Sequence, residues 1–182
     1  MPNSHSFTVT AHGGLLRVLQ TKCFVSQAFD LQGGGNLPAR YEFDAIWDTG
    51  ATASVITQRV VDACGLQPVG MIQVHGVNST EFCEVYLVNI AAPNNVTFPL
   101  INVSKATKLV GADVLIGMDI ITAGDFSITN KDGQTIFSFR VPSQIHVDYV
   151  KEHHAQGLRE KFQHGGSKKN RKHHGKKFGA NK

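Results

Sequence analysis

The 182-residue sequence has little cysteine and no long apolar run. Its 3 cysteines, Cys23, Cys64 and Cys83, are far apart and in no C-x-x-C pair, so neither a disulfide framework nor a cysteine-based zinc site is expected. No segment approaches the roughly 18 apolar residues of a membrane-spanning helix, and the start "MPNSHSFTVTAHGG" lacks the basic-then-apolar pattern of a signal peptide. These absences predict a protein of a reducing compartment without a membrane segment, and the expected location is cytoplasmic.

Charge is divided unevenly along the chain. Residues 1–150 hold 8 Lys and Arg against 12 Asp and Glu, a net charge of −4, whereas residues 151–182 hold 10 against 2, a net charge of +8. The basic segment has lost hydrophobic periodicity, so we expect a disordered tail with at most a short helix at its start. Such a tail could attract an anionic partner weakly and in a salt-dependent way.

The rest of the chain has the pattern of a mostly-β protein. With 41% hydrophobic residues it can bury one sizeable core. Its apolar segments are short, rich in β-branched and aromatic residues, and separated by glycine, proline and asparagine, which is typical of strands. We therefore expect one all-β domain over residues 1–148, followed by a basic, histidine- and lysine-rich tail over residues 149–182.

The same pattern predicts the individual elements. Two short helices are expected, one within residues 57–66 that ends at Gly65 and one over residues 118–123. Strands are expected within residues 15–29, over 40–47, on both sides of a polar tip within 70–90, over 96–104, before Gly117, and in a hairpin over 125–139 that turns at 131–133.

The segment "AIWDTGATASVIT", residues 45–57, raises a chemical question. Residues 45–47 read as a buried strand, while the Asp-Thr-Gly that follows is polar and turn-prone, so the chain carries a carboxylate toward the interior and then bends. A buried carboxylate is costly unless it is paired or used. Asp48 is therefore either a structural turn residue satisfied by local hydrogen bonds or a residue held there for chemistry.

Followed further along the chain by "VLIGMDII", the segment "IWDTGATASVI" resembles the retropepsin-like aspartic proteases, the single-lobe dimeric relatives of pepsin. The resemblance covers roughly residues 14–142. Its outline is closer to bacterial and ubiquitin-shuttle-type members than to the compact viral enzymes, because a hairpin follows the second helix. It implies a single-lobe acid-protease-like β-barrel with a flap hairpin, and hydrolysis of polypeptide substrates without a cofactor.

This chemistry needs two neighbouring carboxyl groups. One carboxylate polarises a water molecule while the other, protonated, donates to the carbonyl oxygen, and the pair shares one proton because two like charges so close cannot both ionise. The resemblance implies that Asp48 is the catalytic carboxylate, that Thr49 hydrogen-bonds across the pair, and that Gly50 allows close backbone approach. The substrate-binding residues that it implies are Ala51 and, near the tip of the flap, Gly76 and Val77.

The sequence contains one Asp-[Ser/Thr]-Gly, so the second carboxylate must come from another copy of Asp48. This predicts a twofold homodimer with the active site on its axis. We expect the interface on the hairpin "DFSITNKDGQTIFSF", which reads as apolar on both faces. Its apolar residues are Phe126, Ile128, Ile136, Phe137 and Phe139.

The segment "VLIGMD" has two further expected roles. The resemblance implies that Leu115 and Ile116 lie beneath the active-site turn and that Gly117 marks a close passage of backbone. For Asp119 two interpretations stay open: a polar residue near the dimer contact, or an exposed acid in the first turn of a helix. Likewise, the expected flap can be an ordinary hairpin turn.

Other functions also stay open at this point. The same fold without turnover would be a dimeric peptide-binding module. A dimeric nucleic-acid-associated protein would use the tail for phosphate contacts, although Phe162 and Phe178 are the only aromatic residues of the basic segment 151–182, so base recognition is not indicated. The stretch "HGGSKKNRKHH" resembles a short zinc-binding tail built on cysteines, but His164, His173 and His174 replace the cysteines and Phe162 replaces a ligand, so no metal is assigned.

Overall fold

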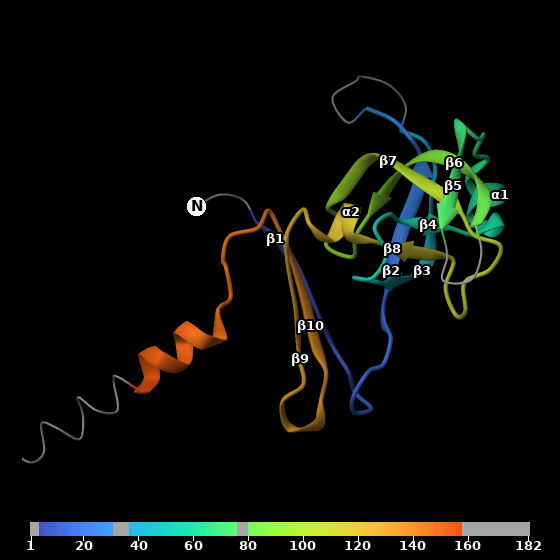
Figure 1. The fold of residues 1–182 in the computed structure, drawn as a ribbon. Coiled ribbons are helices and arrows are strands. Elements are labelled where there is room, and N and C mark those ends of the chain that lie inside the picture. Colours follow the sequence, from blue (N-terminus) through green and yellow to red (C-terminus); the bar gives the residue numbers. More distant parts are fainter. Residues whose placement is uncertain (1–3, 31–36, 76–79, 158–182) are drawn as a thin grey trace, which may run out of the picture. The chain divides into compact units, whose positions relative to one another are not determined.

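The computed structural model describes residues 4–30, 37–75 and 80–157 (Figure 1). The chain divides into two compact units, residues 1–144 and residues 145–182. Every strand of the described residues belongs to the first unit, and in the second unit residues 149–157 are helical. Among the described residues no helix is long and apolar enough to cross a membrane.

The larger sheet of the first unit closes into a barrel. Its strands run in the order β2-β3-β8-β4-β7-β6-β5, and a further pairing of β2 with β6 closes the ring through every strand except β5. Closure pairs the backbone groups that an open sheet would leave at its edges. The strands are β2 (Leu19–Gln27), β3 (Arg40–Trp47), β4 (Val55–Ile56), β5 (Gly70–His75), β6 (Thr80–Ala91), β7 (Thr97–Lys105) and β8 (Val114–Ile116).

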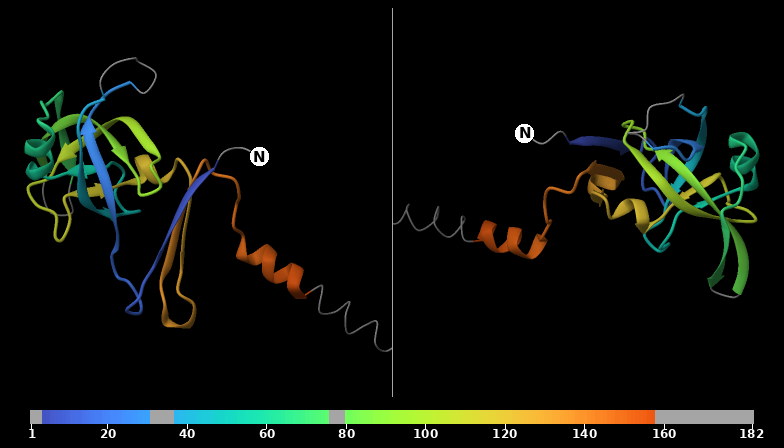
Figure 2. Two further views of the ribbon diagram at one scale, coloured as in Figure 1. Left: turned by 180° about the vertical axis from the view of Figure 1, so that it is seen from behind. Right: turned by 90° about the horizontal axis from the view of Figure 1, so that it is seen from above.

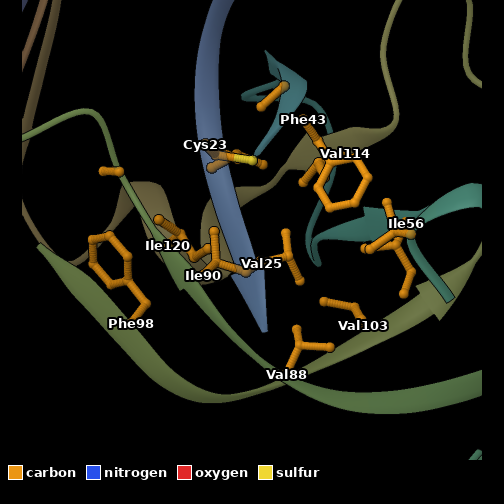
Figure 3. Close-up of a cluster of buried hydrophobic side chains, with 14 of the residues drawn as sticks. Cys23, Val25, Phe43, Ile56, Val88, Ile90, Phe98, Val103, Val114 and Ile120 are labelled. Carbon is orange, nitrogen blue, oxygen red and sulfur yellow. The ribbon is translucent and has the colours of Figure 1, made fainter. Parts of the chain in front are cut away.

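Alternate side chains of these strands fill the barrel. Val25, Val88 and Val103 come from three strands and are fully buried together (Figure 3). The helix α1 (Gln58–Cys64) buries three of its residues in the same core, and it ends at Gly65, whose left-handed φ of 59° favours a residue without a side chain. The expected helix that ends at Gly65 is thereby confirmed.

A second sheet contains the first and the last two strands of the unit. Its order is β1-β10-β9, formed by β1 (His5–Thr10), β9 (Asp125–Thr129) and β10 (Ile136–Val141). We call it the terminal sheet, and its strands lie side by side in the left view of Figure 2. Between the barrel and this sheet the chain forms the helix α2 (Met118–Ile121), and η1 (Lys131–Gly133) turns the β9–β10 hairpin.

One face of the terminal sheet is apolar and packs on Trp47. Phe139 is paired with Phe7 on one side and Phe126 on the other, so the three rings share this face. The rings of Trp47 and Phe139 lie 5.1 Å apart between centroids, and Phe137 and Phe139 are fully buried within the single chain. These residues belong to the protein's own core.

The opposite face of the terminal sheet is polar apart from the half-buried Ile136 at its end. It carries Thr8 and Ser127 beside Ser138, and the Arg140 guanidinium bonds to the carboxylate of Asp125. The expectation of a hairpin that is apolar on both faces was therefore wrong, and Phe137 and Phe139 do not need a partner chain. The physical reason is that β1, which the sequence reading missed, completes a sheet whose aromatic face packs on the protein's own Trp47.

The expected fold class, an all-β single-lobe barrel with short helices, is confirmed. Strand β3 has the expected bounds, and α2 begins at the expected residue. The hairpin of β5 and β6 occurs where the flap was expected, with His75 paired to Thr80. Its tip, including Gly76 and Val77, lies outside the described residues.

Candidate active site

Asp48 lies where β3 ends and the chain turns. Its backbone N–H donates to the carbonyl of Ile116 at 3.0 Å, and its side chain is half-buried. The Gly50 N–H donates to Oδ1 of Asp48 at 2.8 Å, and the Ala51 N–H donates to the Asp48 carbonyl at 3.3 Å. These bonds make a tight turn in which a backbone N–H points at the carboxylate, as expected for a turn residue of this kind.

The strand β8 runs between the two ends of this turn. On one side Trp47 is paired with Ile116, and on the other side Val55 is paired with Leu115. The chain therefore leaves β3 at Asp48, loops over the end of β8, and returns as β4 on the other side. Both ends of the loop over residues 48–54 are fixed by the same short strand.

Gly117, directly after β8, passes against this loop. A Cβ atom at Gly117 would lie 2.7 Å from the carbonyl carbon and oxygen of Ala53 and 3.0 Å from the carbonyl oxygen of Ala51, too close for any side chain. The next N–H, that of Met118, donates to the Ala51 carbonyl at 2.8 Å. This is the close backbone passage that was expected at Gly117.

Ser54 and Asp119 connect the loop to α2. The Ser54 N–H donates to Oδ2 of Asp119 at 2.9 Å, and the Ser54 hydroxyl donates to Oδ1 at 2.8 Å. Asp119 is exposed in the first turn of α2, which agrees with its interpretation as an exposed helix acid. Its pairing with Ser54 could not be predicted from the sequence, because no neighbouring residue specifies a partner 65 positions away.

Trp47 supports the turn from the interior. Its indole N–H donates to the hydroxyl of Thr21 at 2.9 Å, and its rings contact Phe7 and Phe126. A buried indole whose single N–H donor is hydrogen-bonded packs against apolar neighbours without leaving an unsatisfied polar group. The residue before Asp48 is thus fixed on all sides, which limits the movement of the Asp48 backbone.

Three further aspartates of the first unit bind elsewhere. Asp113 accepts hydrogen bonds from the Thr57 hydroxyl and the Arg59 guanidinium, and Asp44 forms an ion pair with Lys22 at 2.8 Å. Asp125 is bound by the Ser143 hydroxyl and by Arg140, which together lower the pKa of its carboxyl well below the usual range.

The remaining residues expected at the site differ in their exposure to solvent. Thr49 and Gly50 are exposed beside the Asp48 carboxylate, and Ala51 is half-buried. Within the described part of the chain, no group of three or more His, Cys, Asp and Glu side chains could hold a metal ion. His164, His173 and His174 lie outside that part.

Residues 39–123 match the family model described as "gag-polyprotein putative aspartyl protease". Over this segment, which is just under half of the chain, the protein is similar to that family of aspartyl proteases. The segment begins just before β3 and contains Asp48, Gly117 and Asp119, so the loop over β8 lies wholly within the matched segment. The strands of the terminal sheet lie outside it.

Two solved structures are similar to this chain. One is a retropepsin-like aspartic protease from Rickettsia conorii, with 12% identity, a TM-score of 0.47, and 76% of this chain and 96% of that chain covered. The other is the retroviral protease-like domain of Ddi1 from Leishmania major, with 15% identity, a TM-score of 0.40, and 68% and 95% covered. No curated protein matches the sequence.

Proposed function

We propose that the protein is an aspartic endopeptidase that hydrolyses polypeptides with two copies of Asp48, one from each subunit of a homodimer. The observation that carries this proposal is the burial and hydrogen bonding of the Asp48 carboxylate. It is half-buried, its Oδ1 accepts the Gly50 N–H, and among the described residues of the single chain its Oδ2 has no hydrogen-bond partner. A carboxylate held in this way is available to a group outside its own chain.

A second copy is the best source of the other carboxyl group. Asp44, Asp113 and Asp125 are engaged in ion pairs with basic side chains, and Asp119 is bound to Ser54. A twofold axis beside Asp48 would bring the two identical turns together, since in a twofold dimer each surface meets its own copy. The exposed Thr49 and Gly50 would then lie at the contact.

The reaction needs both protonation states of the pair. One Asp48 carboxylate accepts a proton from water as the water oxygen bonds to the carbonyl carbon of the substrate. The other Asp48, protonated, donates to the carbonyl oxygen, which gives a tetrahedral diol. When the diol collapses, the C–N bond breaks as the protonated Asp48 gives its proton to the amine nitrogen. A diol hydroxyl gives its proton to the other Asp48 carboxylate, so the pair again holds one proton.

The other expected roles belong to this proposal. Thr49 would hydrogen-bond across the axis and Gly50 would permit close approach of the turns. Ala51, Gly76 and Val77 would contact the substrate chain. The cytoplasmic location and a weak anionic partner for the basic tail also stay predictions.

Cleavage of an unbiased peptide library at about pH 5, where one carboxyl of such a pair is protonated, tests the proposal. The wild type should cleave, and Asp48→Asn, which keeps the shape of the side chain but cannot share the proton, should be folded and inactive. Equal cleavage by the two proteins would overturn the proposal. A wild type that binds a hydroxyl-bearing peptide mimic but cleaves nothing would instead be a peptide-binding module.

A further inference from the structure

Asp119 is exposed, yet its carboxylate is bound to a residue that is not exposed at all. Ser54 has 0% of its surface exposed, and both its N–H and its hydroxyl donate to Asp119, at 2.9 Å and 2.8 Å. Hydrogen bonds to an ionised acceptor are among the stronger ones. Since Ser54 ends the loop that Asp48 begins, Asp119 holds the far end of the Asp48 loop.

The Ser54 hydroxyl serves a second contact at the same time. It accepts the N–H of Gly117 at 3.1 Å while it donates to Asp119. One buried hydroxyl thus joins the loop over residues 48–54 to the end of β8 and to α2. Gly117 passes close to the loop, because a Cβ atom placed there would lie only 2.7 Å from the Ala53 carbonyl.

We propose that Asp119 is a positioning residue for peptide hydrolysis, acting through Ser54 to fix the loop that carries Asp48. The proposal rests on the proposed function. It gives Asp119, an exposed acid of α2, a role in catalysis although the residue does not contact the substrate. The reason lies in the reaction's geometry, because two carboxyl groups share a proton only at a set separation, and a twofold dimer contains two such loops. A shift in the loop would move both carboxyl groups.

Asp62 provides a matched control. It is an exposed helical acid like Asp119, but its side chain bonds to Gln58 within the same helix, α1. Removing the Asp62 carboxylate therefore changes charge and helix contacts without touching the Asp48 loop. Any effect of Asp119 beyond that of Asp62 is assigned to the bond with Ser54.

The test measures kcat and KM of the full-length protein with a peptide that it cleaves. Asp119→Ala should lower kcat by about 10- to 100-fold and leave KM within about threefold, since a small displacement of a reacting group costs rate more than binding. Asp119→Asn keeps an acceptor for the Ser54 N–H, so its kcat should stay within about tenfold of the wild type. Asp62→Ala should change neither constant.

Two further readouts separate positioning from general support of the fold. When two carboxyl groups move apart their coupling weakens, so the two limbs of the pH–rate profile should approach each other in Asp119→Ala. A loss of stability alone would leave the limbs in place. In addition, Ser54→Ala with Asp119→Ala should be little worse than the poorer single variant, because the two residues act as one unit.

The inference is overturned if folded Asp119→Ala keeps a kcat within about twofold of the wild type, or if the limbs of its pH–rate profile stay where they are in the wild type. It is also overturned if the loss of kcat in the double variant equals the product of the losses in Ser54→Ala and Asp119→Ala. Should Asp119→Ala fail to fold, Asp119→Asn and Ser54→Ala are judged by the same criteria. If the wild type cleaves nothing, the proposed function is wrong, and amide hydrogen exchange then tests whether Asp119 positions the loop. The Ser54 and Gly117 amides should then exchange about tenfold faster in Asp119→Ala than in Asp62→Ala, and equal rates would refute the positioning.

Discussion

The indole of Trp47 is stacked on the ring of Phe126, with the ring centroids 5.7 Å apart and the planes inclined by 13°. Trp47 directly precedes Asp48, and Phe126 lies on β9 of the terminal sheet. The terminal sheet therefore contacts the residue before the candidate catalytic acid within one chain. A change in this sheet should affect both the stability of the domain and the environment of Asp48.

Phe139→Ala should lower the free energy of unfolding by roughly 3–5 kcal/mol, because it leaves a cavity against Trp47 and Phe7. Ile128→Ala, on the same hairpin but at a side chain that is 44% exposed, should cost less than about 1.5 kcal/mol. Denaturant unfolding followed by the fluorescence of Trp47, the 1 tryptophan of the sequence, measures both. A Phe139→Ala protein of wild-type stability would contradict its place in the core.

Gly117→Ala should destabilise the protein by about 1–3 kcal/mol or more and reduce peptidase activity, because a methyl group would overlap the Ala53 carbonyl. Gly70→Ala is the matched control, since a Cβ atom there has nothing within 4 Å, and its effect should stay within about 1 kcal/mol. Thermal unfolding and peptide cleavage are measured on both. Equal effects of the two substitutions would show that β8 can move away from the loop.

Sequence and structure agree best where the specifying signal is local. Strand β3 could be predicted with its bounds because an apolar run ends abruptly at Asp-Thr-Gly, and α1 because Gly65 stops it. The turn that carries Asp48 was also foreseeable from those three residues. In each case the residues that decide the structure are neighbours along the chain.

The parts that the sequence did not reveal depend on distant partners. Strand β1 is short, and its partner lies far along the chain, with the Thr8 hydroxyl bonded to Ser138, 130 positions later. Without β1 and Trp47 in view, Phe137 and Phe139 looked like exposed side chains that needed a second copy. The Ser54–Asp119 pair was equally hidden, because a serine and an aspartate are ordinary surface residues until the fold brings them together.

Thiol labelling of the native protein at about pH 8 should modify Cys83 and leave the other two cysteines unmodified. Burial raises the pKa of the Cys23 thiol to about 12 and that of the Cys64 thiol to about 11, so almost no thiolate forms at either residue. Cys83 is half-buried on β6. Mass spectrometry counts the modified thiols, with denaturant-unfolded protein as the control, in which all of them should react. Native labelling at Cys23 would contradict the closed barrel.

Asp125 should make the domain sensitive to acid. The Ser143 hydroxyl, Arg140 and the Gln144 N–H lower the pKa of its carboxyl in the folded protein, so its contribution to stability is present above the unfolded pKa of about 3.9 and is lost as the pH falls below that value. The difference in unfolding free energy between the wild type and Asp125→Asn should therefore be large at about pH 6 and smaller at about pH 3. A difference that is the same at both pH values would show that the charge of Asp125 does not contribute.

Mixing wild-type and Asp48→Asn proteins tests whether the active site is shared between chains. If each site needs an Asp48 from both subunits, a mixed dimer has one carboxyl group and is inactive, so subunit exchange should remove activity without removing any wild-type chain. After exchange with a tenfold excess of Asp48→Asn, random pairing leaves about one eleventh of the wild-type activity. The control adds Asp62→Asn instead, which should increase activity in proportion to the added protein. Size-exclusion chromatography of differently tagged chains establishes that exchange has occurred. Full activity after proven exchange would mean that one Asp48 is sufficient, and the proposed dyad across the twofold axis would be wrong.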